Sequence, residues 1–140
     1  MSLVKLPCYC GTLRQATRAL TKLYDERLQS SGIRATQYTI LQALEISPGA
    51  RIRDLEEVLA MDQTTLTRNL ALLQRRGLLE VTGRPSGREK SWGLTARGKS
   101  TLAAARPLWE RAQAEVRDRV GAKRARSLHD DVFDLIARLA

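Results

Sequence analysis

The sequence has little of what a disulfide scaffold, a metal centre or a membrane anchor requires. Its two cysteines, Cys8 and Cys10, lie so close together that a bridge between them would close almost no loop. With one histidine, His129, a zinc site within one chain would need carboxylate ligands at unfamiliar spacing. No apolar run approaches the roughly 18 residues of a membrane helix. We therefore expect no metal, no cofactor and no membrane partner, with His129 on the surface.

Aromatic residues and export signals are scarce as well. Aromatics make up 4% of the chain, too few to form a surface on which single-stranded bases stack. The first residues, MSLVKLPCYCG, contain neither a long apolar stretch nor a small-residue cleavage site. We expect a cytoplasmic protein.

Positive charge is what the chain has in excess. Its 140 residues include 24 Lys and Arg against 15 Asp and Glu, a formal net charge of +9. This balance favours a polyanionic partner, with nucleic acid first, although many proteins are basic only for solubility. The length and the 43% hydrophobic content fit one folded domain.

Helical spacing of apolar residues predicts three helices in the first 60 residues. The first runs from Leu13 to Leu28, and the second runs from Gln37 to Leu44 with Thr36 as its cap. The third is short, and its expected buried face consists of Ile52, Leu55, Val58 and Leu59.

A fourth helix follows so closely that it forms a helix-turn-helix candidate with the third. Asp62 is a good N-cap, and the helix is expected to run to Arg76 and to end at Gly77. Residues 78–82 and 91–94 read as short strands around a loop at 83–88, whose glycines and proline suit a hairpin tip. This hairpin is the predicted wing.

The C-terminal part is again helical. After Thr95, a predicted cap, apolar residues repeat for about 25 residues, and Pro107 should bend or break this helix. Gly121 interrupts the pattern, and a last helix carries the apolar row Leu128, Val132, Leu135, Ile136 and Leu139. The apolar faces of the helices at both chain ends could cover each other within a monomer. They present more apolar surface than a small core can bury, however, so we expect a homodimer.

The fourth helix has the chemistry of a DNA-recognition helix. Leu66, Leu70 and Leu73 share one face, which leaves threonines and Arg68 outside. A solvated face would more often carry Glu and Lys pairs, whereas short hydroxyls and an arginine suit phosphates and base edges. Residues 62–99 hold eight Lys and Arg against three Asp and Glu, +5 of the net +9. The predicted DNA contacts are Gln63, Thr64, Thr65, Thr67 and Arg68 on the helix and Arg84, Arg88 and Lys90 on the wing.

In the order and spacing of these motifs, nearly the whole chain resembles MarR-type winged-helix regulators. The resemblance is carried by Ile52 to Glu56, by Met61 to Leu70, by the run Arg76-Gly77-Leu78-Leu79, and by Leu94-Thr95-Ala96-Arg97-Gly98. It implies a homodimer that binds palindromic operators and releases them when a ligand or an oxidant acts. One position departs from the pattern: the family often has an acidic residue two positions before the wing-tip arginine, here Arg88, and this chain has Ser86.

The resulting fold prediction is a mainly α protein with a small β-wing. A single MarR-like domain spans 1–140, with the winged helix-turn-helix at about 36–99 and dimerisation helices at about 7–30 and 100–140.

The spacing of Cys10, Tyr24 and Tyr38 resembles the organic-hydroperoxide-sensing branch of the family, in which a reactive cysteine begins the first helix. If Pro7 is the first helical residue, Cys8 and Cys10 lie near a helix N-terminus, which favours a thiolate that an oxidant converts to sulfenic acid. That branch usually adds a tyrosine where this chain has Ala35. Alternatively these are packing residues, or a small molecule binds in a dimer cleft lined by Tyr24, Tyr38 and Trp109. The candidate sensor residues are Cys8, Cys10, Tyr24 and Tyr38.

Together these observations predict a sequence-specific regulator of transcription, a repressor, that binds double-stranded DNA and is released by an oxidant or a small ligand. A thiol-dependent redox enzyme is the first alternative, but the chain has neither a CxxC motif nor a βαβ pattern. A sequence-neutral architectural nucleic-acid-binding protein is the second. We do not expect an enzyme.

Overall fold

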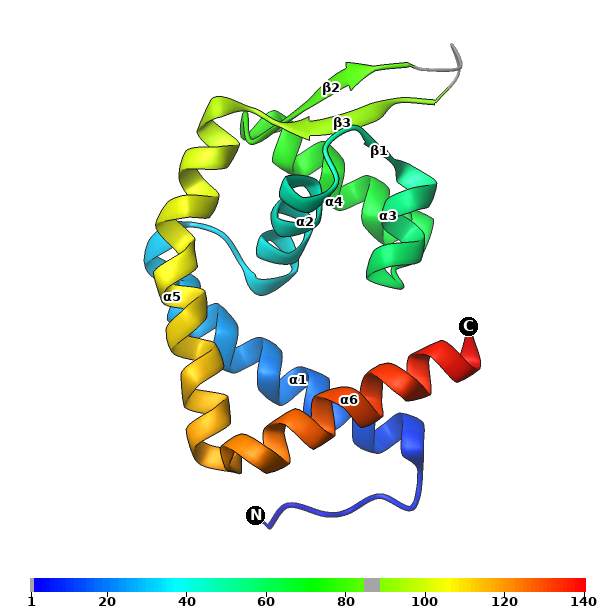
Figure 1. Cartoon of the computed structure of the whole chain (residues 1–140), viewed down its shortest axis with the longest axis vertical. Coiled ribbons are helices and arrows are strands. Elements are labelled where there is room, and N and C mark those ends of the chain that lie inside the picture. The colour runs from blue at the N-terminus through cyan, green and yellow to red at the C-terminus, as the bar shows by residue number, and fades with distance from the viewer. Residues whose placement is uncertain (1, 85–88) are drawn as a thin grey trace.

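Helices dominate the computed structural model, which describes residues 2–84 and 89–140 (Figure 1). The helices are α1 (Tyr9–Leu28), α2 (Ala35–Ile46), α3 (Ile52–Leu59), α4 (Gln63–Arg75), α5 (Ala96–Val120) and α6 (Ala122–Leu139), with a 3-10 turn, η1, at Gln29–Ser31. Three short strands, β1 (Ala50–Arg51), β2 (Leu79–Gly83) and β3 (Ser91–Leu94), form an antiparallel sheet. The predicted class, mainly α with a small β-wing, is confirmed.

β3 is the central strand of the sheet. It pairs with β2, where Leu79 lies opposite Leu94, and with β1, where Ala50 lies opposite Trp92. β2 and β3 are the predicted wing strands, with β2 shifted by one residue. β1 was not predicted, because two residues are too few for an alternating pattern.

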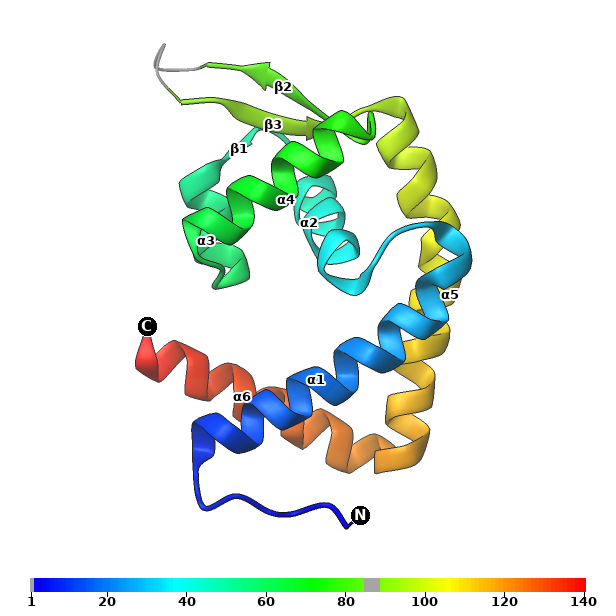
Figure 2. The ribbon, with the colours of Figure 1, turned by 180° about the vertical axis from the view of Figure 1, so that it is seen from behind.

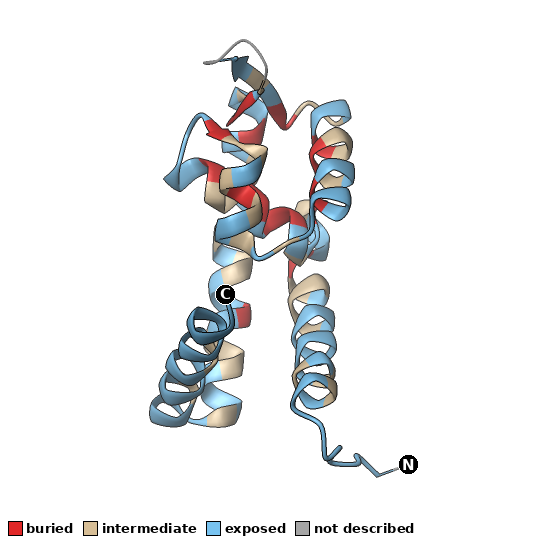
Figure 3. Ribbon diagram, turned by 90° about the vertical axis from the view of Figure 1, so that its right-hand side faces the viewer, coloured by how far each residue is buried: buried red, intermediate tan, exposed pale blue. Residues whose placement is uncertain are grey.

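Most of the hydrophobic core lies in the winged part of the molecule, which comprises α2, α3, α4 and the three-stranded sheet. Figure 3 shows the buried residues gathered there, while α6 is exposed along its length. The largest fully buried side chains are Leu28, Tyr38, Ile40, Leu41, Leu44, Leu55, Leu66, Leu70, Leu73, Leu79 and Leu102. Val58, expected on the buried face of α3, is 70% exposed, because this helix of eight residues is covered on one side only.

α5 connects the winged part to the helices at the chain ends. Thr95 caps it as predicted: the Gly98 amide donates to Thr95 Oγ1 at 2.9 Å, and this hydroxyl donates to the Gly77 carbonyl at 2.6 Å. The helix continues through Pro107 on a curved course (Figure 1). Of the two expected outcomes, a bend or a break, the break does not occur. Gly121, with φ of +96°, separates α5 from α6.

α2 begins two residues before the predicted start. The amide of Ala35 donates to Asp25 Oδ1 of α1 at 2.8 Å, and the Arg34 amide donates to Gln37 Oε1 at 2.9 Å. Thr36 therefore lies inside the first turn and is not the cap. The cap comes from a helix ten residues earlier, which local sequence does not indicate.

α1 and α6 both pack against α5. Arg27 of α1 forms a two-pronged ion pair with Glu115 of α5, with N–O distances of 2.7 and 2.8 Å. α1 begins at Tyr9, four residues earlier than predicted. Among the described residues, no helix is both long and apolar enough to cross a membrane.

Candidate nucleic-acid interface

α4 is fixed on the body by its apolar face and by its N-cap. Leu66, Leu70 and Leu73 are completely buried, as predicted. The carboxylate of Asp62 accepts a hydrogen bond of 3.0 Å from the amide of Thr65. This bond lowers the pKa of Asp62, because it stabilises the ionised carboxylate. α4 therefore starts at a defined residue and presents a defined outer face.

The turn between α3 and α4 sets the relative orientation of the two helices. Ala60 ends α3 in the left-handed region, with φ of +50° and ψ of +39°. The amide of the next residue, Met61, donates to the carbonyl of Glu56 at 3.3 Å. The two helices then pack against each other as the predicted helix-turn-helix.

The C-terminal end of α4 is attached to the segment between α1 and α2. Arg76 donates to the carbonyl of Gly32 at 2.7 Å and to Gln37 Oε1 at 3.5 Å. Gly77, with φ of +74°, ends the helix where the sequence predicted. Contacts at both ends thus position α4 relative to the rest of the fold.

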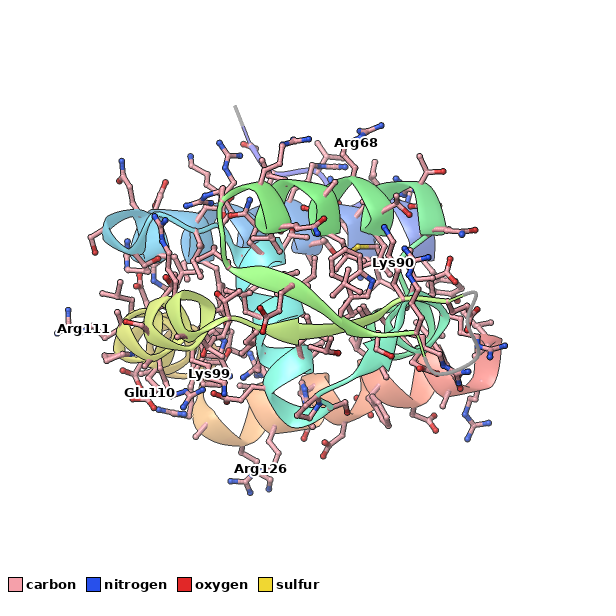
Figure 4. All side chains as sticks on the ribbon, turned by 90° about the horizontal axis from the view of Figure 1, so that it is seen from above. Arg68, Lys90, Lys99, Glu110, Arg111 and Arg126 are labelled. Carbon is pink, nitrogen blue, oxygen red and sulfur yellow. The ribbon has the colours of Figure 1, made fainter. Side chains whose placement is uncertain are left out.

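The outer face of α4 is uncovered. Figure 2 shows α4 at the front of the winged part with no other described element over it. The predicted contact residues of this helix are all exposed: Gln63, Thr64, Thr65, Thr67 and Arg68. In Figure 4, Arg68 lies at the outer edge of α4 and points away from the body.

The wing supplies further cations. Arg84, which follows β2, is exposed, and so is Lys90, which precedes β3. The Lys90 ammonium group lies over the Trp92 ring, 5.9 Å from its centroid, which holds part of the side chain against the sheet. Arg88, the predicted tip contact, lies outside the described residues.

Sequence reasoning missed an ion-pair cluster at the start of β3. Glu89 Oε2 lies 3.5 Å from Arg51 Nη1 and 3.2 Å from Arg53 Nη2. Arg51 also contacts Asp54, with Nε 3.1 Å from Oδ2. The signal was present as two arginines flanking Ile52, but nothing local indicates that Glu89 is their partner.

The face formed by α4 and the wing has the chemistry to bind duplex DNA. Hydroxyl and amide groups of α4 can bond to phosphates and base edges, and Arg68 can bond to a phosphate or to a guanine. A single α-helix has a width that fits the major groove. β2 of the wing packs against α4, so the wing and this helix belong to one part of the molecule.

The structure separates the candidate sensor residues within one chain. Cys8 is the N-cap of α1, and its Sγ accepts from the Gly11 amide at 3.3 Å, so Pro7 precedes the helix instead of beginning it. Cys8 and Cys10 are both exposed. Cys10 and Tyr24 are on the same helix, 14 residues and therefore about 21 Å apart. They form no common site in one chain.

The two tyrosines instead contact α5. Tyr24 donates to Gln113 Oε1. Tyr38 is buried and stacks on Trp109, with ring centroids 5.5 Å apart and an interplanar angle of 17°. Burial raises the pKa of both phenols. Tyr38 and Trp109 therefore lie together, as the expected ligand-binding cleft requires. Within one chain, however, their rings pack directly on each other.

His129 lies on the surface, as predicted, with its side chain 86% exposed. In the part of the chain that the structure describes, no three His, Cys, Asp or Glu side chains are grouped to hold a metal ion.

Known proteins with this architecture include DNA-binding regulators. The model of the MarR family matches residues 31–89. The M. tuberculosis transcriptional regulator MosR in complex with DNA is 36% identical, with 91% of this chain and 92% of that chain covered and a TM-score of 0.83. The PcaV transcriptional regulator of Streptomyces coelicolor in complex with its natural ligand is 27% identical, with 99% and 96% covered and a TM-score of 0.78. Apo MarR from E. coli shares the fold at 20% identity, with 94% and 98% covered and a TM-score of 0.75. No significant match is found among curated proteins.

Proposed function

The chain belongs to the MarR family and is a DNA-binding transcriptional regulator, and from this premise we propose that it is a sequence-specific repressor. It binds a palindromic operator as a homodimer and leaves the operator when an effector acts. The observation that carries the proposal is the uncovered polar face of α4 beside a basic wing.

In the proposed complex, α4 enters the major groove. Gln63 and Thr64, in its first turn, and Arg68, one turn later, read base edges. Thr65 and Thr67 bond to the flanking phosphates, which fixes the helix in register. Arg84, Arg88 and Lys90 of the wing contact the neighbouring backbone or the minor groove.

The homodimer is supported by an apolar row on α6 that its own protomer does not cover. None of the residues of α6, all of which the structure describes, is buried. The row includes large apolar side chains that are exposed: Leu128 at 53%, Ile136 at 47% and Leu139 at 78%. Removing them from water in a second copy would stabilise the assembly. Two recognition helices related by a two-fold axis explain why the operator would be palindromic.

In this proposal the chain is one domain with two parts. Residues at about 36–99 bind DNA, and residues at about 7–30 and 100–140 form the dimer. Asp25 of α1 caps α2, and Arg76 joins the end of α4 to Gly32 in the segment between α1 and α2. A change in the arrangement of α1 would therefore reach the recognition helix.

Two classes of effector fit the residues present. An oxidant would act on Cys8 or Cys10, which are exposed at the start of α1, in the proposed dimerisation part. A small molecule would bind near Tyr24, Tyr38 and Trp109, where α1, α2 and α5 meet. Operator affinity with and without an organic hydroperoxide, in the parent and in Cys10→Ser, separates the two classes.

The DNA-binding assignment is tested with Arg68→Ala and a matched control. Duplexes selected by the protein from a random pool serve as the operator, and affinity is measured at fixed salt by fluorescence anisotropy. We expect Arg68→Ala to cost about 1–3 kcal/mol of operator binding. The control is Arg126→Ala on α6, the same change on a side of the molecule away from Arg68 (Figure 4). Equal affinity of the two variants would refute the assignment of Arg68.

A further inference from the structure

Glu89 is the one carboxylate in a basic stretch of the wing. Residues 81–93 contain Arg84, Arg88 and Lys90, and Glu89 stands between the last two. An acidic residue in this position repels the phosphates of a bound duplex. Its presence at a DNA-binding surface therefore calls for another physical role.

The structure supplies that role in two ion pairs across the fold. Glu89 Oε2 is 3.2 Å from Arg53 Nη2 and 3.5 Å from Arg51 Nη1. The oxygen that makes both contacts is shielded from solvent, although the Glu89 side chain as a whole is 33% exposed. Shielding strengthens the attraction relative to a pair at the open surface.

Arg51, one of the two partners of Glu89, is itself held in place. Arg51 is the residue before α3, and its strand β1 pairs with β3, with Arg51 opposite Ser91. Asp54 accepts a hydrogen bond from the Arg51 amide at 2.9 Å and contacts its guanidinium group. Glu89 lies two residues before Ser91, so its ion pairs extend the attachment of β3 beyond the end of the β1 pairing.

We propose that Glu89 is a positioning residue for DNA recognition: it attaches the start of β3 to Arg51 and Arg53 at the beginning of α3. This attachment sets where Lys90 meets the DNA backbone relative to α4. It also engages two arginines that would otherwise bind phosphates of any sequence. Glu89 thus raises the preference for the operator at the expense of general affinity for DNA. The inference rests on the proposed function.

Charge and positioning make opposite predictions for Glu89→Gln, which gives a sharp test. If only charge counts, removing one negative charge strengthens binding to every duplex. If Glu89 positions the wing, the variant binds the operator roughly tenfold more weakly, the loss expected for one well-placed contact. Its affinity for a random-sequence duplex stays the same or rises.

The matched control is Glu80→Gln. Glu80 lies on β2, is exposed, and makes no ion pair within the described residues. Like Glu89→Gln, its replacement removes one negative charge from the basic segment 62–99. Both variants are compared with the parent on the selected operator and on random duplex at the same salt. Hydrogen exchange of the β2 and β3 amides is measured without DNA.

Selective loss of operator binding in Glu89→Gln, together with faster amide exchange in β2 and β3, supports the proposal. If both variants bind the operator and the random duplex more tightly, and by the same factor, the proposal is overturned. An equal loss on both duplexes with a lower midpoint of unfolding also overturns it, because the role is then purely structural. If Glu89→Gln does not fold, Arg53→Gln replaces it, since Arg53 is 59% exposed and its removal leaves the core intact.

A failure of the proposed function has a different signature. The parent would then show no preference for any selected duplex. The exchange of the β2 and β3 amides in Glu89→Gln would still report whether Glu89 holds the strand.

Discussion

Gly98 is the position at which the structure predicts a large effect from a single methyl group. A Cβ built there would lie 2.0 Å from the carbonyl oxygen of Leu78 and 3.0 Å from its carbonyl carbon. Both groups are backbone, so no side-chain rotation relieves the contact. The first turn of α5 and the start of β2 would have to move apart by about 1 Å, which also disturbs the Thr95 cap.

The cost of Gly98→Ala follows from two opposing terms. Replacing glycine by alanine inside a helix stabilises the helix by about 1 kcal/mol. Overpacking of a rigid contact costs about 1–3 kcal/mol and more where backbone must move. Because the clash is backbone against a new carbon at 2.0 Å, we expect a net loss of about 3 kcal/mol, or about 10 °C in the midpoint of thermal unfolding.

The assay is denaturant unfolding followed by circular dichroism. All variants are compared at one protein concentration, because the proposed dimerisation would make stability depend on concentration. The matched control is Gly11→Ala in the first turn of α1. There the nearest atom is Leu6 Cδ1 at 3.1 Å, the end of a side chain in the N-terminal segment. We expect this control to be neutral or up to about 1 kcal/mol more stable. A Gly98→Ala protein as stable as the parent would refute the packing argument.

Two further predictions concern the cap of α4 and the apolar row of α6. The pKa of Asp62 is lowered in the folded protein, so its contribution to stability is complete above the ordinary value of about 3.9 and is lost as pH falls through the lowered value. Asp62→Asn keeps a capping side chain that does not titrate, so its free energy of unfolding should match that of the parent near pH 7 and fall less in acid. Parallel curves of unfolding free energy against pH, from pH 7 to 3, would contradict this. Ile136→Asp should shift the dimer dissociation constant upward at least about tenfold in sedimentation, whereas Ser127→Asp on the polar side of α6 should not. An unchanged dimer dissociation constant in both variants would rule out the apolar row of α6 as the interface.

α4 is the part of the molecule that the sequence indicated best. Its cap at Asp62, its buried leucines and its end at Gly77 are all present as predicted. These features depend on residues three or four positions apart, and such short-range patterns are visible in one sequence. The wing strands and the Thr95 cap were found for the same reason.

Contacts between distant segments were decided only by the tertiary structure. Asp25 caps α2, Arg76 reaches Gly32, and Glu89 pairs with Arg51 and Arg53, and none of these partners is identified by spacing. Such pairings depend on how elements are placed in space, because a charged side chain has many possible partners in a chain with this many charges.

The sequence by itself therefore determined which segments are helices, which face of α4 is outward, and that positive charge is concentrated around it. The tertiary structure alone decided that Val58 is exposed, that Cys10 and Tyr24 do not meet in one chain, and that Glu89 pairs with Arg51 and Arg53. The physical reason is that periodicity records which side of an element is apolar. It does not record which other element, or which charged group, will cover that side.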